Sequence, residues 1–178
     1  MHSFDAAKTH FQRFGLAPSF RLDMSQLEQS FRALQAEVHP DKSAHLADSE
    51  QRLAMQRSTL VNEAYQTLKS PIKRARYLLS LQGVDTQEET NTAMPVDFLM
   101  AQMEWREAVA DAERLRDVAA LDQLESRMKQ DTRELEAQLA VKIDDERDYE
   151  GAAQLVRKLR FMEKLAEEIS SAYDEIDN

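Results

Sequence analysis

The tetrapeptide His39-Pro40-Asp41-Lys42 lies between two stretches with helical periodicity, and it decides the predicted fold of the first half of the chain. Apolar residues precede it at helical spacing, at Leu27, Phe31, Leu34 and Val38. A second periodic run follows, with Leu53, Leu60, Val61, Ala64, Tyr65 and Leu68. Such spacing is typical of amphipathic helices, and Pro40 disfavours the helical conformation at His39. The sequence therefore predicts two antiparallel helices with a charged loop at their tip.

This tip has two interpretations. A loop with rigid packing beneath it is a good place to present side chains to a partner. Alternatively, the tetrapeptide is only a polar turn, since a short string has functional meaning only in the right structural context. His39, Asp41 and His45 are also close enough in sequence to suggest a metal site. Solvated side chains are the favoured interpretation, because no fourth ligand or second shell is indicated.

The predicted helices have recognisable starts and a recognisable end. Asp23 and Ser25 are both plausible N-caps for the helix that precedes the tip, and Ser25 begins a capping-box pattern. Pro71 suits the first turn of a following helix. Residues 83–95 are polar and lack apolar periodicity, which is typical of a linker. We therefore expect one domain over residues 1–82 and a second over residues 96–178.

Three helical stretches follow this linker, with breaks near residues 114–117 and 144–148. In the middle stretch one face carries Leu121, Leu124, Met128, Leu135, Leu139 and Ile143. In the last stretch one face carries Leu155, Leu159, Met162, Ala166, Ile169 and Tyr173. Amphipathic helices joined by short turns predict a three-helix bundle. The predicted fold class is therefore all-α throughout.

The first bundle helix, which begins after Pro95, carries apolar residues on two sides. At about 100° per residue, the expected core side has Phe98, Ala101, Trp105, Ala108, Val109, Ala112 and Leu115. The opposite side has Leu99, Met100 and Met103 together with Glu104, Glu107 and Asp111. Phe161 similarly lies about 100° from the centre of its own helix's apolar stripe. This second set is either an exposed partner surface, which Met would suit, or a surface that packs on another part of the chain.

Composition excludes several classes of function. The chain has 178 residues and no cysteine, which excludes disulfides, thiolate metal sites and cysteine catalysis and suits a reducing cytoplasm. No signal peptide is visible, and no apolar run approaches the ~18 residues that span a membrane. Three glycines are too few for a phosphate-cradling loop. Neither a cofactor nor an enzymatic activity is expected, since no nucleophile motif is present.

Charge differs between the two halves of the chain. Residues 1–82 hold 11 Lys/Arg and 8 Asp/Glu, whereas residues 83–178 hold 12 and 25. Halves of opposite sign suggest two surfaces for two different partners, although an acidic half also serves solubility alone. The basic excess is too small to indicate nucleic-acid binding.

The segment from Thr9 to Gly83 resembles a J-domain. The resemblance rests on Phe14-Gly15-Leu16, the HPDK tetrapeptide, VNEAYQTL at 61–68, the Ser70-Pro71 break and RARYLL at 74–79. The ending YLLSLQG at 77–83, with FLM at 98–100 and KLRF at 158–161, is similar to the HscB family of iron–sulfur cluster co-chaperones. This resemblance covers nearly the whole chain after the first eight residues.

The resemblance implies two binding surfaces. The J-domain would engage the DnaK-class ATPase HscA through His39, Pro40, Asp41, Lys42 and Arg32, and would stimulate its ATP hydrolysis. The bundle would hold the iron–sulfur cluster scaffold IscU through Leu99, Met100, Met103, Glu104, Glu107, Asp111 and Phe161. Met103 stands where the family commonly has Leu, and Asp111 is shorter than the usual Glu. Because Arg32 is the sole basic residue of its predicted helix, we expect selectivity for one chaperone.

Two other functions would account for parts of the sequence. A general J-protein for misfolded clients would share the tip, but the chain lacks the Gly/Phe-rich and cysteine-rich regions of such proteins. A plain helical interaction protein would account for the helices and leave the HPDK tip unexplained. An ATPase assay with HscA and DnaK side by side separates the three.

Overall fold

The computed structural model describes residues 8–38, 48–88 and 94–177. Within these ranges the chain forms helices and no strands, so the prediction of an all-α fold is confirmed. Two compact units make up the chain, and they divide between Leu78 and Leu79. This division falls inside a helix, whereas the sequence placed the end of the first domain at residue 82.

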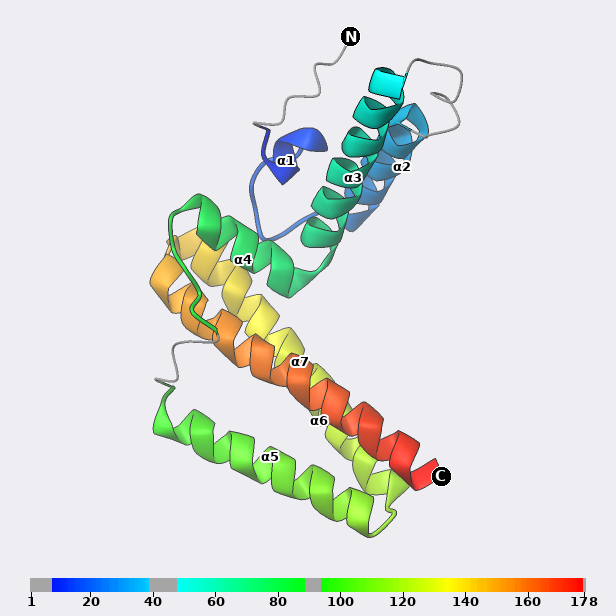
Figure 1. Cartoon of the computed structure of the whole chain (residues 1–178). Coiled ribbons are helices and arrows are strands. Elements are labelled where there is room, and N and C mark those ends of the chain that lie inside the picture. The colour runs from blue at the N-terminus through cyan, green and yellow to red at the C-terminus, as the bar shows by residue number, and fades with distance from the viewer. Residues whose placement is uncertain (1–7, 39–47, 89–93, 178) are drawn as a thin grey trace. The chain divides into compact units, whose positions relative to one another are not determined.

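The first unit contains α1 (His10–Arg13), α2 (Met24–Val38), α3 (Asp48–Lys69) and most of α4 (Pro71–Leu81). Helices α2 and α3 pack against each other, and α1 packs on α3 (Figure 1). The Phe31 ring stacks on the Tyr65 ring with 3.9 Å between centroids. The buried core includes Phe11, Phe14, Phe20, Leu27, Val61, Ala64, Leu68 and Ile72. The predicted pairing of the two long helices is therefore confirmed.

The N-terminal part of α3 is more exposed than its periodicity predicts. Since Phe31 lies against Tyr65 and the two helices are antiparallel, the end of α2 at Val38 comes opposite Ser58. Leu53 therefore lies beyond the end of α2, and its side chain is exposed together with that of Met55. The expectation that Leu53 joins the packed face is wrong, because the partner helix is shorter than α3.

Asp23 is the residue that begins α2. Its Oδ1 accepts hydrogen bonds from the backbone N–H groups of Ser25 at 2.9 Å and Gln26 at 3.1 Å. These donors have no partner inside the helix, and an Asp at the N-cap satisfies them. Ser25 lies inside the first turn, so the alternative that Ser25 is the cap is wrong.

Arg74 fastens the end of α3 to α4. The residue is buried, and its Nη1 donates a 2.6 Å hydrogen bond to the carbonyl of Leu68. Its guanidinium also lies 4.8 Å from the centre of the Phe20 ring. A cation is favourable at a helix C-terminus, where carbonyls lack partners and the helix dipole is negative. Arg74 thus joins α3, α4 and the segment before α2 in one packed corner.

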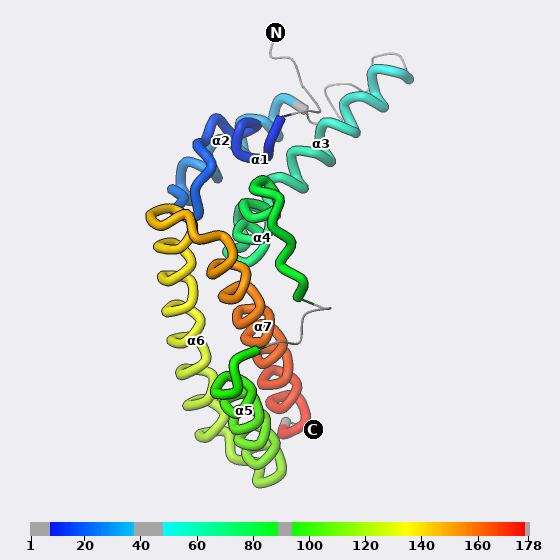
Figure 2. Tube along the Cα trace, turned by 90° about the vertical axis from the view of Figure 1, so that its left-hand side faces the viewer, coloured from blue at the N-terminus to red at the C-terminus, as the bar shows by residue number. Residues whose placement is uncertain are grey.

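The second unit is a bundle of α5 (Val96–Arg114), α6 (Val118–Ala140) and α7 (Tyr149–Asp177). Each of the three helices packs against the other two (Figure 2). Its buried residues include Trp105, Val109, Leu121, Met128, Leu139, Val156, Leu159, Leu165 and Ile169. The guanidinium of Arg127 covers the Trp105 ring at 4.6 Å. Leu115, expected on the core face, is 64% exposed; it is the C-cap of α5, one residue beyond the last helical residue Arg114.

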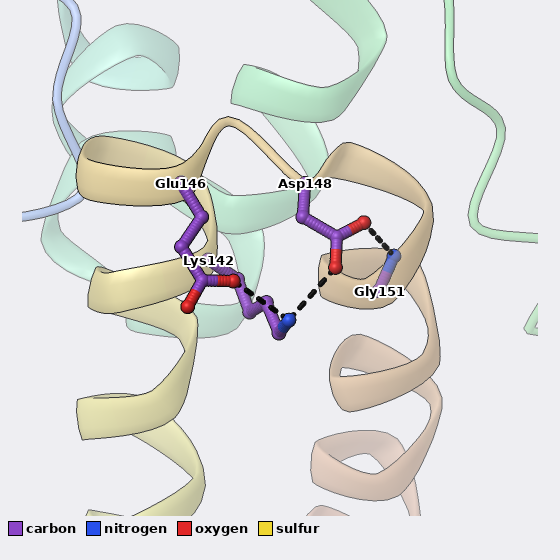
Figure 3. Close-up of polar contacts among 4 residues, drawn as sticks. All are labelled: Lys142, Glu146, Asp148 and Gly151. Atoms are coloured by element: carbon purple, nitrogen blue, oxygen red, sulfur yellow. Dashed lines mark hydrogen bonds and ion pairs between the residues drawn. The ribbon is translucent and has the colours of Figure 1, made fainter.

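The turn between α6 and α7 is fixed by one ion cluster. The π-helical segment η2 (Val141–Glu146) continues α6, and Arg147 adopts φ 54° to reverse the chain. Asp148 then caps α7, since its Oδ1 accepts a 2.9 Å hydrogen bond from the N–H of Gly151. The Nζ of Lys142 lies 2.8 Å from carboxylate oxygens of both Glu146 and Asp148 (Figure 3).

The described part of the predicted linker is attached to the bundle. Gly83, at φ 75°, ends α4, and the N–H of Val84 donates to the carbonyl of Leu79 at 3.0 Å. Further on, the Nη1 of Arg157 donates a 3.0 Å hydrogen bond to the carbonyl of Thr86. Residues 83–88 therefore run from α4 to a fixed point on α7.

Candidate functional site

The helices on both sides of the predicted chaperone-binding tip are described. His39, Pro40, Asp41 and Lys42 lie outside the described residues, as does His45. Helix α2 runs to Val38 and α3 begins at Asp48, and the two helices pack together. The role of the tip therefore stays a prediction that rests on the sequence and on this pair of helices.

Arg32 lies on an exposed part of α2. Its Nη2 is 2.5 Å from the Oε1 of Glu28, one helical turn earlier. An exposed pair of this kind contributes about 0.3–0.5 kcal/mol, so a carboxylate of a partner can displace Glu28 at little cost. Its proposed contact with a chaperone stays a prediction.

The second apolar side of α5 faces water. Leu99 is 41% exposed, Met100 58% and Met103 72%, as the helical spacing predicts. Val96, which the sequence reasoning missed, is 72% exposed on the same side. Val96 lies seven residues, or about two helical turns, before Met103, so helical spacing would have placed it on the same side. We call Val96, Leu99, Met100 and Met103 the α5 stripe.

Carboxylates edge the α5 stripe on one side. Glu104, Glu107 and Asp111 are all exposed. Asp111 accepts a 2.9 Å hydrogen bond from the Nη2 of Arg114. Its charge is therefore partly neutralised within the helix, whereas no such contact is described for Glu104 and Glu107. Glu104 and Glu107 therefore place negative charge beside the stripe.

Phe161 differs from the prediction. Its side chain is only 7% exposed, so the expectation that it forms part of an exposed surface is wrong. The Phe161 ring meets the Phe98 ring edge-on with 5.6 Å between centroids, and the Arg106 guanidinium lies 5.8 Å from it. The side of α7 that carries Phe161 faces α5, so α5 covers the Phe161 ring. Any role of Phe161 in binding would act from beneath Leu99, which lines the same cleft.

The described residues show neither a metal-ion cluster nor a membrane span. Within residues 8–38, 48–88 and 94–177, no group of three or more His, Cys, Asp or Glu side chains is placed to hold a metal ion. In the same part of the chain, no helix combines the length and the apolar character needed to span a membrane.

Two family descriptions match the chain, one for each unit. A DnaJ domain matches residues 9–77. The HSCB C-terminal oligomerisation domain matches residues 94–170. Together they cover both sets of helices described above.

Curated relatives match over nearly the full length. A "Co-chaperone protein HscB homolog" from Azoarcus sp. (strain BH72) is 48% identical over 99% of each chain. Another from Chromobacterium violaceum is 51% identical over 98% of each chain. Among solved structures, the chaperone HscB from Vibrio cholerae has a TM-score of 0.84 and 37% identity over 95% of this chain and 99% of its own. Human co-chaperone protein HscB has a TM-score of 0.88 and 32% identity over 93% and 82%.

Proposed function

Because the chain belongs to the HscB family of co-chaperones, we propose that it links a client to a chaperone ATPase. The client is the iron–sulfur cluster scaffold IscU, and the chaperone is the DnaK-class protein HscA. The chain is not itself an enzyme. It binds IscU, delivers it to HscA and stimulates ATP hydrolysis there, which assists the maturation of iron–sulfur proteins in the cytoplasm.

The pair of helices in the first unit supports the chaperone contact. Helices α2 and α3 pack along each other around the Phe31–Tyr65 stack, and Arg74 holds the far end. This packing gives the HPDK tetrapeptide a rigid base. In the proposal Asp41 meets an arginine of the ATPase, His39 and Pro40 shape the loop, and Arg32 and Lys42 add positive charge.

The α5 stripe is the observation that carries the client contact. Four large apolar side chains of one helix are exposed to water, so they contribute little to the stability of the bundle. Contiguous exposed apolar surface rimmed by polar residues often marks a protein–protein site. Met100 and Met103 are flexible and polarisable, which suits a surface that adapts to its partner. Glu104 and Glu107 would steer the encounter electrostatically.

Steady-state ATPase assays with HscA and DnaK side by side test this proposal. We expect the protein to stimulate HscA more strongly than DnaK, and IscU to increase the stimulation of HscA further. Equal stimulation of both chaperones, without any effect of IscU, would instead indicate a general J-protein. No stimulation of either would indicate a purely structural role.

A further inference from the structure

A basic cleft opens beside the α5 stripe. It has a volume of about 220 Å³ and lies between α5 and α7, with Leu99 and Phe161 among its lining residues. Three cations come from α7, at Arg157, Arg160 and Lys164, and Arg106 comes from α5. The α7 cations are spaced three and four residues apart, so they share one face of that helix. We call these six residues the basic cleft.

The charge of this cleft is opposite to that of its surroundings. Residues 83–178 carry 12 Lys/Arg against 25 Asp/Glu, yet four cations and a single carboxylate, Glu88, line this cleft. Glu88 accepts a 2.6 Å hydrogen bond from the Oγ1 of Thr86 and leaves an excess of positive charge. Glu163 lies 3.1 Å from Arg160, and Glu168 lies 3.4 Å from Arg106. These pairs are between exposed side chains and are weak, so an incoming anion can replace the glutamates at little cost.

Arg157 is held in place at this cleft by the segment that precedes α5. Its Nη1 is engaged with the carbonyl of Thr86. Its Nε is buried, and none of the residues that the structure describes forms a hydrogen bond with it. Buried donors without a partner are rare in folded proteins and call for an explanation. The carbonyl of Thr86 is neutral, so it leaves the positive charge of Arg157 to add to the potential of the cleft.

The cleft and the carboxylates lie on opposite sides of the α5 stripe. At about 100° per residue, Arg106 comes about 60° before Met103 around α5, and Glu104 comes about 100° after it. Leu99 belongs both to the stripe and to the cleft lining. A partner that covers the stripe therefore meets cations on one side and carboxylates on the other.

We infer that the basic cleft binds an acidic segment of the same scaffold client that binds the α5 stripe. The inference rests on the proposed function, because it assigns a second contact to that client. Leu99 joins the two surfaces, and the charge of the cleft selects aspartate or glutamate side chains. With carboxylates on the opposite side of the stripe, the client fits in one orientation only, because the reverse orientation sets like charges against each other.

A pair of double variants tests the inference. Arg160→Gln with Lys164→Gln removes two cations of the cleft. Lys129→Gln with Arg133→Gln removes two exposed cations of α6, away from the cleft. Both variants change the net charge equally, and each removes one ion-paired cation, because Lys129 lies 2.7 Å from Glu125. A difference in binding between the two variants therefore reflects where the charges lie and not how many are removed.

Calorimetric titration of the full-length variants with IscU gives the comparison. At about 0.05 M salt we expect the Kd of the cleft variant to rise about fivefold to tenfold, and that of the control to change less than about twofold. The difference should shrink at about 0.5 M salt, where charges are screened beyond about 4 Å. Equal Kd values for the two variants would overturn the inference.

Two further measurements separate failure of this inference from failure of the proposed function. Arg160→Glu should weaken binding, and an Asp→Lys or Glu→Lys change in the client should restore it. If alanine substitution of the α5 stripe also leaves client binding intact, the proposed client site itself is wrong. If inorganic phosphate alone shifts the NMR signals of Arg160 and Lys164 but IscU does not, the cleft is a small-anion site and the inference is wrong.

Discussion

Alanine substitution of Leu99, Met100 and Met103 should separate client binding from stability. Met100 and Met103 keep more than half of their surface in water. Truncation of such exposed residues costs within about 0.5 kcal/mol each, and the higher helix propensity of alanine offsets part of that loss. Leu99 is more covered, so we expect about 1 kcal/mol for the triple variant. A domain of this size loses about 4–8 °C of melting temperature for 1 kcal/mol.

Phe161→Ala is the matched contrast to the triple variant. The Phe161 side chain is buried against Phe98, and loss of a buried Phe side chain costs about 3–5 kcal/mol. Its melting temperature should fall by at least about 12 °C. The triple variant, in contrast, should lose client affinity about 100-fold or more, because anchors at the centre of an interface contribute about 2 kcal/mol or more each.

The assay combines thermal unfolding with titration by IscU. Trp105 is the only tryptophan of the chain, and it is buried in the bundle. Its fluorescence therefore reports the unfolding of the second unit. A loss of stability in the triple variant as large as that of Phe161→Ala would refute the prediction, because the α5 stripe would then be part of the buried core. The prediction is also refuted if the triple variant binds IscU as the unchanged protein does.

Three other predictions concern stability. Arg74→Met should destabilise the first unit by about 1.5–3 kcal/mol, the contribution of a charged hydrogen bond, and denaturant unfolding followed by circular dichroism measures it. Gly151→Ala should not give the usual gain of about 1 kcal/mol for removing a helical glycine, because an added Cβ would collide with the capping carboxylate of Asp148; a more stable variant would contradict this. Burial lowers the pKa of His10 below 6.5, so the folded state takes up its proton less readily than the unfolded state. The stability of the first unit should therefore fall as the pH drops below about 6.5, and His10→Gln should weaken that dependence.

The sequence predicts most of the helices because their causes are local. The proline that begins α4 and the periodicity of α6 and α7 are readable from single segments. The sequence leaves the choice between Asp23 and Ser25 as N-cap open, because either side chain can accept hydrogen bonds from the first backbone N–H groups of the helix. Only the hydrogen bonds to Asp23 decide it.

The candidate client site is only partly predictable for a similar reason. Periodicity gives the phase of a residue on its own helix, which correctly separates Leu99, Met100 and Met103 from Trp105. It does not say where the neighbouring helix lies. Phe161 was therefore expected in water, although α5 covers it. The basic cleft was missed because its cations come from two helices that are distant in sequence.

The ATPase rate of HscA with IscU and the Asp41→Asn variant tests the central claim most directly. In the proposed function, one protein joins a client surface on the bundle to a chaperone contact at the J-domain tip. The variant should keep its helical circular dichroism and bind IscU with unchanged affinity, yet it should not raise the ATPase rate of HscA above the basal value. Full stimulation by Asp41→Asn would contradict the account, because the HPDK tip would then not be the contact through which the protein acts on the chaperone.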